Sequence, residues 1–129
     1  EDIYLDAVRY LNLVGLGSKA DDDARSLPFG QQRLLAIARS LAARPSVLLL
    51  DEPAAGLNRM EKNDLADLIR RIQEMGITIL LVEHDMELVM RLAEWVVVLD
   101  HGRRLAQGTA QQVRRDEGVI AAYLGTEGA

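Results

Sequence analysis

The sequence predicts an α/β fold with a mainly parallel sheet, flanking helices and a short β-hairpin. Short aliphatic runs of strand length alternate with longer segments whose apolar residues recur at helical spacing. Near the C-terminus, a turn signal at 100–102 separates two more short runs, which is typical of a hairpin. Ligands of parallel sheets bind beyond the carboxyl ends of the strands, so the residues that come directly after each aliphatic run are the functional candidates.

The first part of the chain reads as two helices and a polar connector. Apolar residues over 3–14 recur at helical intervals, and two glycines end this helix. The acidic run at 21–23 is interpreted as a solvated loop that caps the next segment. A second helix is expected over 30–43, because the Arg-Pro-Ser run at 44–46 stops it.

The middle of the chain predicts two strands, each followed by a helix. Val47–Leu50 is a continuous aliphatic run, a pattern that favours a strand buried on both faces of a parallel sheet. A third helix is expected over 60–75, with Gly76 as its C-terminal cap. A second buried strand is expected over 77–82, and Asp85 can cap the start of a short fourth helix.

The C-terminal part predicts a hairpin and a final helix. A strand over 95–99 and another over 103–107 flank the Asp-His-Gly turn. Thr109 can cap the following helix, and residues 125–129 are expected to fray.

Composition excludes several functional classes. The chain has 129 residues, 49% of them hydrophobic and 27% charged, which suits one domain or a piece of a larger one. A net charge of −5 without a basic block argues against binding to a nucleic-acid backbone. The absence of cysteine excludes a disulfide scaffold, a thiolate metal site and a cysteine nucleophile.

The first chemical candidate is the acidic pair Asp51 and Glu52, which comes after an aliphatic run. An aspartate at the end of a buried strand can hold Mg²⁺, and the neighbouring glutamate can polarise a water molecule that attacks a phosphate. Acidic residues also end strands simply because the chain leaves the core there, so both interpretations stay open.

Two further segments are candidates for phosphate recognition. In the segment 27–33, Gly30 would allow a ligand close to the backbone, and the start of the following helix offers N–H groups to an anion. His84, directly after the second aliphatic run, could donate a hydrogen bond to a phosphate oxygen. A capped helix without a ligand and a surface histidine are the alternatives.

Taken together, these segments resemble the ATP-binding subunit of ABC transporters. Leu27–Gln31 resembles the signature loop, Val47–Glu52 the Walker B strand, Ala55–Asn58 the D-loop and His84 the switch histidine. The resemblance implies a partial P-loop NTPase core, of the RecA-like ABC ATPase type.

The resemblance also implies a division of the chain. Residues 1–29 correspond to the end of the helical subdomain and the signature loop, 30–108 to the C-terminal half of the ATPase core, and 109–129 to a helical tail. The phosphate-binding motif G-x-x-x-x-G-K-[ST] does not occur in the 129 residues. We therefore expect the C-terminal portion of a subunit about twice as long, inactive by itself and either marginally stable or self-associating.

Three segments are similar to the branched-chain amino acid importers within this family: Asp51–Asn58, Glu83–Met86 and the ending over 108–125. This likeness implies a bacterial subunit on the cytoplasmic side of the inner or plasma membrane that powers uptake of branched-chain or related amino acids. Its implied partners are a second ATPase subunit in a head-to-tail dimer, transmembrane permease subunits and, indirectly, an extracellular or periplasmic amino-acid-binding protein.

The resemblance assigns a role to each site residue. Asp51 would hold the Mg²⁺ of ATP, Glu52 would position the attacking water, and His84 would contact the terminal phosphate. The second subunit's nucleotide would be served by the signature residues Leu27, Phe29, Gly30 and Gln31, with Asn58 near the dimer contact. Pro28 stands where the family usually has serine, and it offers neither a hydroxyl nor an N–H. Asn58 stands where the family often has aspartate.

Two other functions share these motifs. A truncated, non-catalytic module could pair with partner subunits without hydrolysing ATP. A chromosome ATPase of the SMC type also has a signature loop and a Walker B strand, but the charge of −5 and the transporter-like ending argue against it. Intact Asp51, Glu52 and His84 favour descent from a working ATPase.

Overall fold

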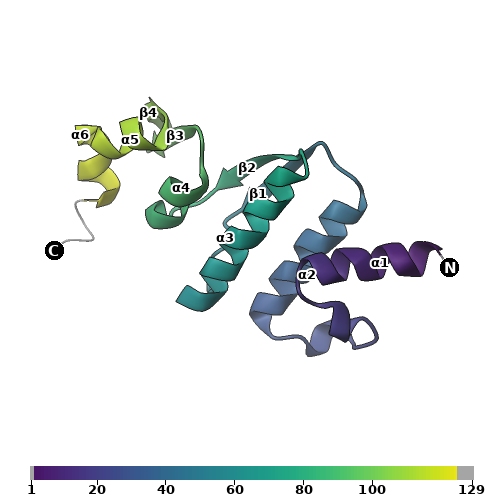
Figure 1. Ribbon diagram of the computed structural model, residues 1–129. Helices are drawn as coiled ribbons and strands as arrows, with labels where there is room; N and C mark the ends of the chain where they lie inside the picture. The colour runs from purple at the N-terminus through teal and green to yellow at the C-terminus, as the bar shows by residue number, and fades with distance from the viewer. Residues whose placement is uncertain (1, 125–129) are drawn as a thin grey trace. The chain divides into compact units, whose positions relative to one another are not determined.

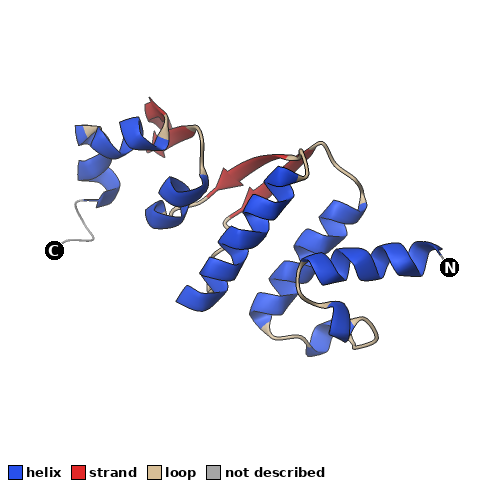
Figure 2. Ribbon diagram, viewed as in Figure 1, coloured by secondary structure: helices blue, strands red, loops and turns tan. Residues whose placement is uncertain are grey.

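The computed structural model describes residues 2–124, and the chain divides into two compact units, Glu1–Val82 and Glu83–Ala129. The order of the elements is shown in Figure 1 and their type in Figure 2. The first unit contains three α-helices and a parallel strand pair, and the second contains a hairpin covered by short helices. The expected fraying of residues 125–129 lies outside the described residues.

Two helices and a capped connector open the first unit. Helix α1 (Asp2–Leu13) is followed by two short 3₁₀ turns, η1 (Gly17–Lys19) and η2 (Ala24–Ser26), and then by α2 (Phe29–Ala42). Helix α1 lies across α2 in Figure 1. The Asp23 carboxylate accepts a hydrogen bond from the Arg25 N–H at 2.9 Å and so caps η2. The acidic connector is therefore a cap, as predicted.

The parallel pair consists of β1 (Val47–Asp51) and β2 (Thr78–Val82), in register from Val47 opposite Thr78 to Asp51 opposite Val82. Helix α3 (Arg59–Glu74) is the crossover between them. It begins with a capping box, in which Asn58 and Glu61 each bind the other's backbone N–H. The predicted parallel pairing and crossover helix are confirmed.

The prediction that the first strand is buried on both faces is wrong, and the second strand is not fully buried as predicted either. Leu48 and Leu50 are only 4% and 8% exposed, but Leu49 is 68% exposed. On β2, Leu80 and Val82 are likewise 57% and 54% exposed. Successive side chains of a strand point to opposite faces. The described residues of this unit bury one face of β1 and leave the corresponding face of β2 half-buried.

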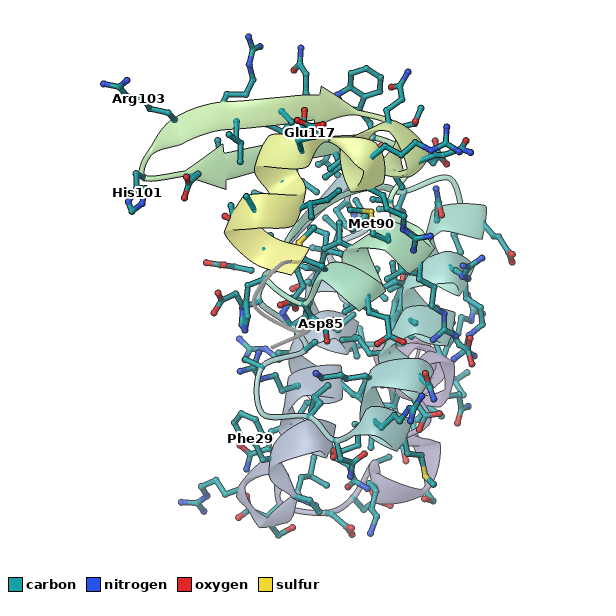
Figure 3. All side chains as sticks on the ribbon, turned by 90° about the vertical axis from the view of Figure 1, so that its left-hand side faces the viewer. Phe29, Asp85, Met90, His101, Arg103 and Glu117 are labelled. Carbon is teal, nitrogen blue, oxygen red and sulfur yellow. The ribbon has the colours of Figure 1, made fainter. Side chains whose placement is uncertain are left out.

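The second unit begins with α4 (Met86–Leu92), continues through β3 (Val96–Asp100) and β4 (Arg103–Gly108), and ends in α5 (Ala110–Arg115), α6 (Glu117–Val119) and η3 (Ile120–Leu124). The strands pair antiparallel, which confirms the predicted hairpin. Both turn residues have positive φ, +48° at His101 and +75° at Gly102, as a tight two-residue hairpin turn requires. Figure 3 shows His101 and Arg103 at the tip of the hairpin, pointing away from it.

The two predicted caps of this unit are present. The Asp85 carboxylate accepts from the Leu88 N–H at 3.1 Å, at the start of α4. The Thr109 hydroxyl accepts from the Gln112 N–H at 3.2 Å, and Gln112 Oε1 accepts from the Thr109 N–H at 3.0 Å. Each cap satisfies N–H groups that a helix leaves without an internal partner.

The core of the second unit is aliphatic. It is formed by five buried valines, Val89, Val96, Val98, Val113 and Val119. Met90 and Tyr123 are among the partly buried side chains packed against them. Two of these valines come from β3, so one face of that strand is buried, while its other face is exposed at Val97 and Leu99.

Two neighbouring valines on β3 provide a matched test of this core. Val98 is 5% exposed and Val97 is 52% exposed. We expect Val98→Ala to lower the free energy of unfolding by about 2 kcal/mol, because it removes two buried methyl groups and leaves a cavity. Val97→Ala should change it by less than about 0.5 kcal/mol. Urea unfolding followed by circular dichroism, at one fixed chain concentration, measures both losses relative to the unchanged chain, and equal losses would contradict the assigned burial.

Candidate functional site

The acidic pair lies at the carboxyl end of β1, as predicted. Asp51 is the last residue of the strand, paired with Val82, and Glu52 is the next residue. The Glu52 N–H donates to the Val82 carbonyl at 2.7 Å, and the Glu52 carbonyl accepts from the Ala55 N–H at 3.2 Å. Both acidic residues are exposed, so their carboxylates can be reached by a ligand at this end of the sheet.

Glu52 has a left-handed backbone, with φ of +47°. Residues other than glycine rarely adopt this conformation, because their Cβ atom crowds the following carbonyl. The chain turns sharply there, from the strand into the loop that leads to α3. The conformation fixes the direction in which the Glu52 side chain leaves the backbone.

The segment that resembles the signature loop, Leu27–Gln31, is called the signature turn below, and it packs against the loop after β1. Phe29 and Gly30 form the first turn of α2, after Pro28, whose ψ of 156° places it just outside the helix. A Cβ atom on Gly30 would collide with the Glu61 carboxylate and would lie 3.5 Å from Leu57 Cδ2. Glu61 cannot move away freely, since its Oε1 accepts from the Asn58 N–H at 3.2 Å in the capping box. The small size of Gly30 therefore also serves helix packing.

Phe29 makes the second contact between these segments. Its ring is 56% exposed and lies on the outside of α2 in Figure 3. A Cβ atom on Gly56 would lie 3.1 Å from Phe29 Cε1, so the ring lies close beside the Gly56 backbone. The segment resembling the signature loop and the segment resembling the D-loop are thus brought together within the first unit.

Arg33 joins the signature helix to the acidic pair, and sequence reasoning missed it. Its Nη1 donates to the Glu52 carbonyl at 2.8 Å, across 19 residues of sequence. Its guanidinium lies over the Phe29 ring, 5.0 Å from the centroid. The i, i+4 spacing of Phe29 and Arg33 on a helix is the one sequence signal that could have indicated this stacking.

Leu27 and Gln31 are both turned inward. Leu27 is only 8% exposed. The Leu27 backbone carbonyl accepts a hydrogen bond from Gln32 Nε2 at 3.0 Å. Gln31 Oε1 is buried without a hydrogen-bond partner within the part of the chain that the structure describes. Gln31 also lines a cleft of about 480 Å³ between the end of α1, the start of α2 and α3.

The remaining predicted residues have local roles that the structure makes plain. Asn58 Oδ1 accepts from the Glu61 N–H at 2.8 Å and thereby starts α3. His84 belongs to the second unit, where its side chain is 70% exposed and its Nδ1 lies 3.7 Å from Glu83 Oε1. The nucleotide contacts of Asn58 and His84 stay predictions.

An ion pair between Arg25 and Asp23 lies in the connector before α2. Arg25 donates to both Asp23 oxygens, at 3.2 Å from Nε and 2.9 Å from Nη2. The hydrogen bonds from Arg25 lower the pKa of the Asp23 carboxyl below its ordinary value. Asp23 therefore stays ionised, and its cap on η2 stays formed, as the pH falls toward that value.

The acidic pair at the end of β1 offers carboxylates that could take part in holding a metal ion. Among residues 2–124, no group of three or more histidine, aspartate or glutamate side chains is arranged to hold an ion. Mg²⁺ characteristically takes one or two carboxylates together with phosphate oxygens and water, rather than a cage of protein ligands. The exposed carboxylate of Asp51 fits that donor set.

Among residues 2–124, no helix has both the length and the hydrophobicity to cross a bilayer.

Sequence models of two families match the chain. The ABC transporter model matches residues 5–55, and the model of the branched-chain amino acid ATP-binding cassette transporter matches residues 103–129. The first match covers most of α1 together with α2, β1 and the acidic pair, and the second covers β4 and the short helices after it.

Curated branched-chain amino acid transport ATP-binding proteins are similar to this sequence over most of its length. The high-affinity branched-chain amino acid transport ATP-binding protein BraF of Pseudomonas aeruginosa is 48% identical over 120 residues, which are 92% of this chain and 47% of that protein. LivG of Escherichia coli, with the same description, is 45% identical over the same shares. The chain thus spans about half the length of the curated relatives it matches.

Solved structures agree with the fold. A crystal structure of an ATP-binding cassette of an ABC transporter in its ADP conformation superposes with a TM-score of 0.87 at 28% identity, over 97% of this chain and 51% of that one. The cbiO1 protein of Clostridium perfringens, part of an ABC transporter complex, gives 0.81 at 34% identity, over 93% and 48%. The fold is therefore that of part of a P-loop NTPase cassette, and the chain belongs to the ATP-binding family of ABC transporters, with marked likeness to branched-chain amino acid transport ATP-binding proteins.

Proposed function

We propose that this chain is part of the ATP-binding and ATP-hydrolysing subunit of an ABC importer that powers uptake of branched-chain or related amino acids. The observation that carries the proposal is the exposed Asp51–Glu52 pair at the end of β1, in a chain that is 48% identical to a branched-chain amino acid transport ATP-binding protein.

The acidic pair divides the chemistry between its two members. Bound ATP and Mg²⁺ supply the transferable phosphoryl group and the cation that neutralises its charge. Asp51 would hold the cation through its exposed carboxylate. Glu52 would orient a water molecule and accept its proton, and His84 would donate a hydrogen bond to the terminal phosphate. Such catalysis is mainly positioning and electrostatic stabilisation.

The signature turn would serve the nucleotide of a second subunit. The first N–H groups of α2 point out of the helix start, where the helix dipole favours an anion. Because Pro28 has no hydroxyl or N–H, this contact would come from Gly30, from Gln31 and from the backbone beside Leu27 and Phe29. Asn58 would lie near the contact between subunits.

The partners are implied by this arrangement. Two subunits would face each other head to tail, each contributing a signature turn to the other's nucleotide. Their closure would shift transmembrane permease subunits between two states at the cytoplasmic face of the membrane, a coupling by differential binding. An amino-acid-binding protein on the other side would deliver the cargo.

The 129 residues themselves are proposed to be inactive as an ATPase. They contain no G-x-x-x-x-G-K-[ST] segment to cradle the phosphates. Pairing without hydrolysis is therefore the second candidate function for this chain alone.

The proposal is tested by transport. The complete subunit, assembled with its permease in vesicles and supplied with the amino-acid-binding protein outside, should drive uptake of labelled leucine only when ATP is inside. The 129-residue chain in its place should drive none. Uptake of other solute classes but not of leucine, valine or isoleucine would overturn the cargo. The absence of ATP hydrolysis by the assembled complex would overturn the ATPase itself.

A further inference from the structure

The backbone of Glu52 requires support from outside its own loop. Its φ of +47° is a conformation that residues other than glycine rarely adopt. It persists only where surrounding contacts determine it. The hydrogen bond from the Glu52 N–H to the Val82 carbonyl, at 2.7 Å, fixes one end of the residue.

Arg33 fixes the other end. Its charged Nη1 donates to the Glu52 carbonyl at 2.8 Å, whereas the local donor, the Ala55 N–H, is farther away at 3.2 Å. Hydrogen bonds from a charged donor are about twice as strong as neutral ones.

Phe29 holds the arginine in place. The guanidinium lies 5.0 Å from the centre of the ring, and the ring edge lies close beside the backbone of Gly56. Two contacts therefore link α2 to the loop after β1. One is the bond from Arg33 to Glu52, and the other is the contact of the Phe29 ring with Gly56. Arg33 contacts both the ring and the carbonyl, so α2 constrains the position of the Glu52 carbonyl from outside its own loop.

We propose that Arg33, supported by Phe29, is the positioning residue for Glu52. It touches neither water nor phosphate in this role. It holds the backbone from which the Glu52 carboxylate projects, and so sets where that carboxylate meets the attacking water. The inference rests on the proposed function of Glu52 as the group that activates water.

A positioning role predicts a particular kinetic pattern. Losing the Arg33 bond leaves the Ala55 bond to the same carbonyl, so the loop stays folded but Glu52 is less well aimed. Small misplacements of a catalytic group lower the rate of the chemical step strongly and affect substrate binding little. We expect Arg33→Gln to lower kcat for ATP hydrolysis about tenfold with KM unchanged.

The experiment compares four variants of the complete subunit assembled with its permease. Arg33→Gln removes the charged donor, Arg33→Lys keeps a charge without the planar fork, and Phe29→Leu removes the ring. Arg39→Gln is the matched control, an exposed arginine on the same helix. We expect kcat losses of about tenfold for Arg33→Gln, smaller losses for Arg33→Lys and Phe29→Leu, and no change for Arg39→Gln.

A double variant separates positioning from general loss of structure. In a Glu52→Gln background, Arg33→Gln should lower the residual rate no further, because there is no carboxylate left to aim. A further tenfold loss would show that Arg33 acts independently and would overturn the inference.

Other outcomes are equally decisive. A kcat for Arg33→Gln within twofold of the unchanged subunit, an increase in KM alone, or an equal loss in Arg39→Gln would overturn the inference while leaving the ATPase proposal standing. Failure of the unchanged subunit to hydrolyse ATP would overturn both. If Arg33→Gln does not fold, Arg33→Lys and Phe29→Leu decide: rates equal to those of the unchanged subunit would overturn the inference.

Discussion

Replacing Glu52 by glutamine in the complete subunit is expected to lower ATP turnover at least a hundredfold while leaving ATP binding intact. Glutamine has nearly the shape of glutamate, so the loop after β1 keeps its contacts through the backbone of residue 52. Its amide cannot accept a proton from water at neutral pH. Release of inorganic phosphate measures turnover, and retention of labelled ATP on a filter measures binding.

The matched control for this variant is Glu74→Gln, which removes the same charge from the exposed end of α3. It should leave both turnover and binding unchanged. Turnover of Glu52→Gln at the rate of the unchanged subunit would remove Glu52 from the role of base. Loss of ATP binding together with turnover would instead assign Glu52 to holding the nucleotide.

Local signals in the sequence predicted most of the elements because each signal acts over a few residues. Asp85 and Thr109 cap helices in the structure, as their position before helical patterns indicated. The turn at His101 and Gly102 closes the hairpin with two positive φ angles. In each of these cases, the stabilising hydrogen bond or backbone conformation lies within the segment that predicts it.

Burial of the strands could not be predicted in the same way. The run Val47–Leu50 shows only that the strand is apolar, and its burial depends on which layers cover the sheet. The structure places Leu48 in the core and Leu49 at the surface, although the two side chains are chemically identical. The covering layer is a property of the surrounding chain and not of the strand.

The candidate site also has features that the local sequence predicts and features that depend on residues far apart in the chain. The positions of Asp51 and Glu52 at the end of β1 are predicted by the local pattern of an aliphatic run and two carboxylates. The bond from Arg33 to the Glu52 carbonyl joins residues 19 positions apart, and no local pattern encodes it. The positive φ of Glu52 is also hidden from sequence, because glutamate rarely adopts it and no glycine marks the position.

The uncovered face of the β1–β2 pair leads to the second large effect. Leu49 and Leu80 lie opposite each other in the ladder, at 68% and 57% exposure, beside the exposed Val47 and Val82. A contiguous apolar face of this kind is a site of association. The 129-residue chain is therefore expected to self-associate, and light scattering coupled to gel filtration should give a mass well above its 14.3 kDa.

Replacing Leu49 by lysine and Leu80 by glutamate should restore a monomer. The two new side chains would face each other across the strands and form a cross-strand ion pair, so the β1–β2 ladder is preserved while the face becomes polar. Met60→Lys, at a position on α3 that is 74% exposed, adds a charge away from this face and should leave the association unchanged. A monomeric unchanged chain that unfolds cooperatively would contradict the prediction, because the exposed strand face would then not drive association. In the complete subunit, the same double variant should impair folding, since the charges would be buried wherever another layer packs on the sheet.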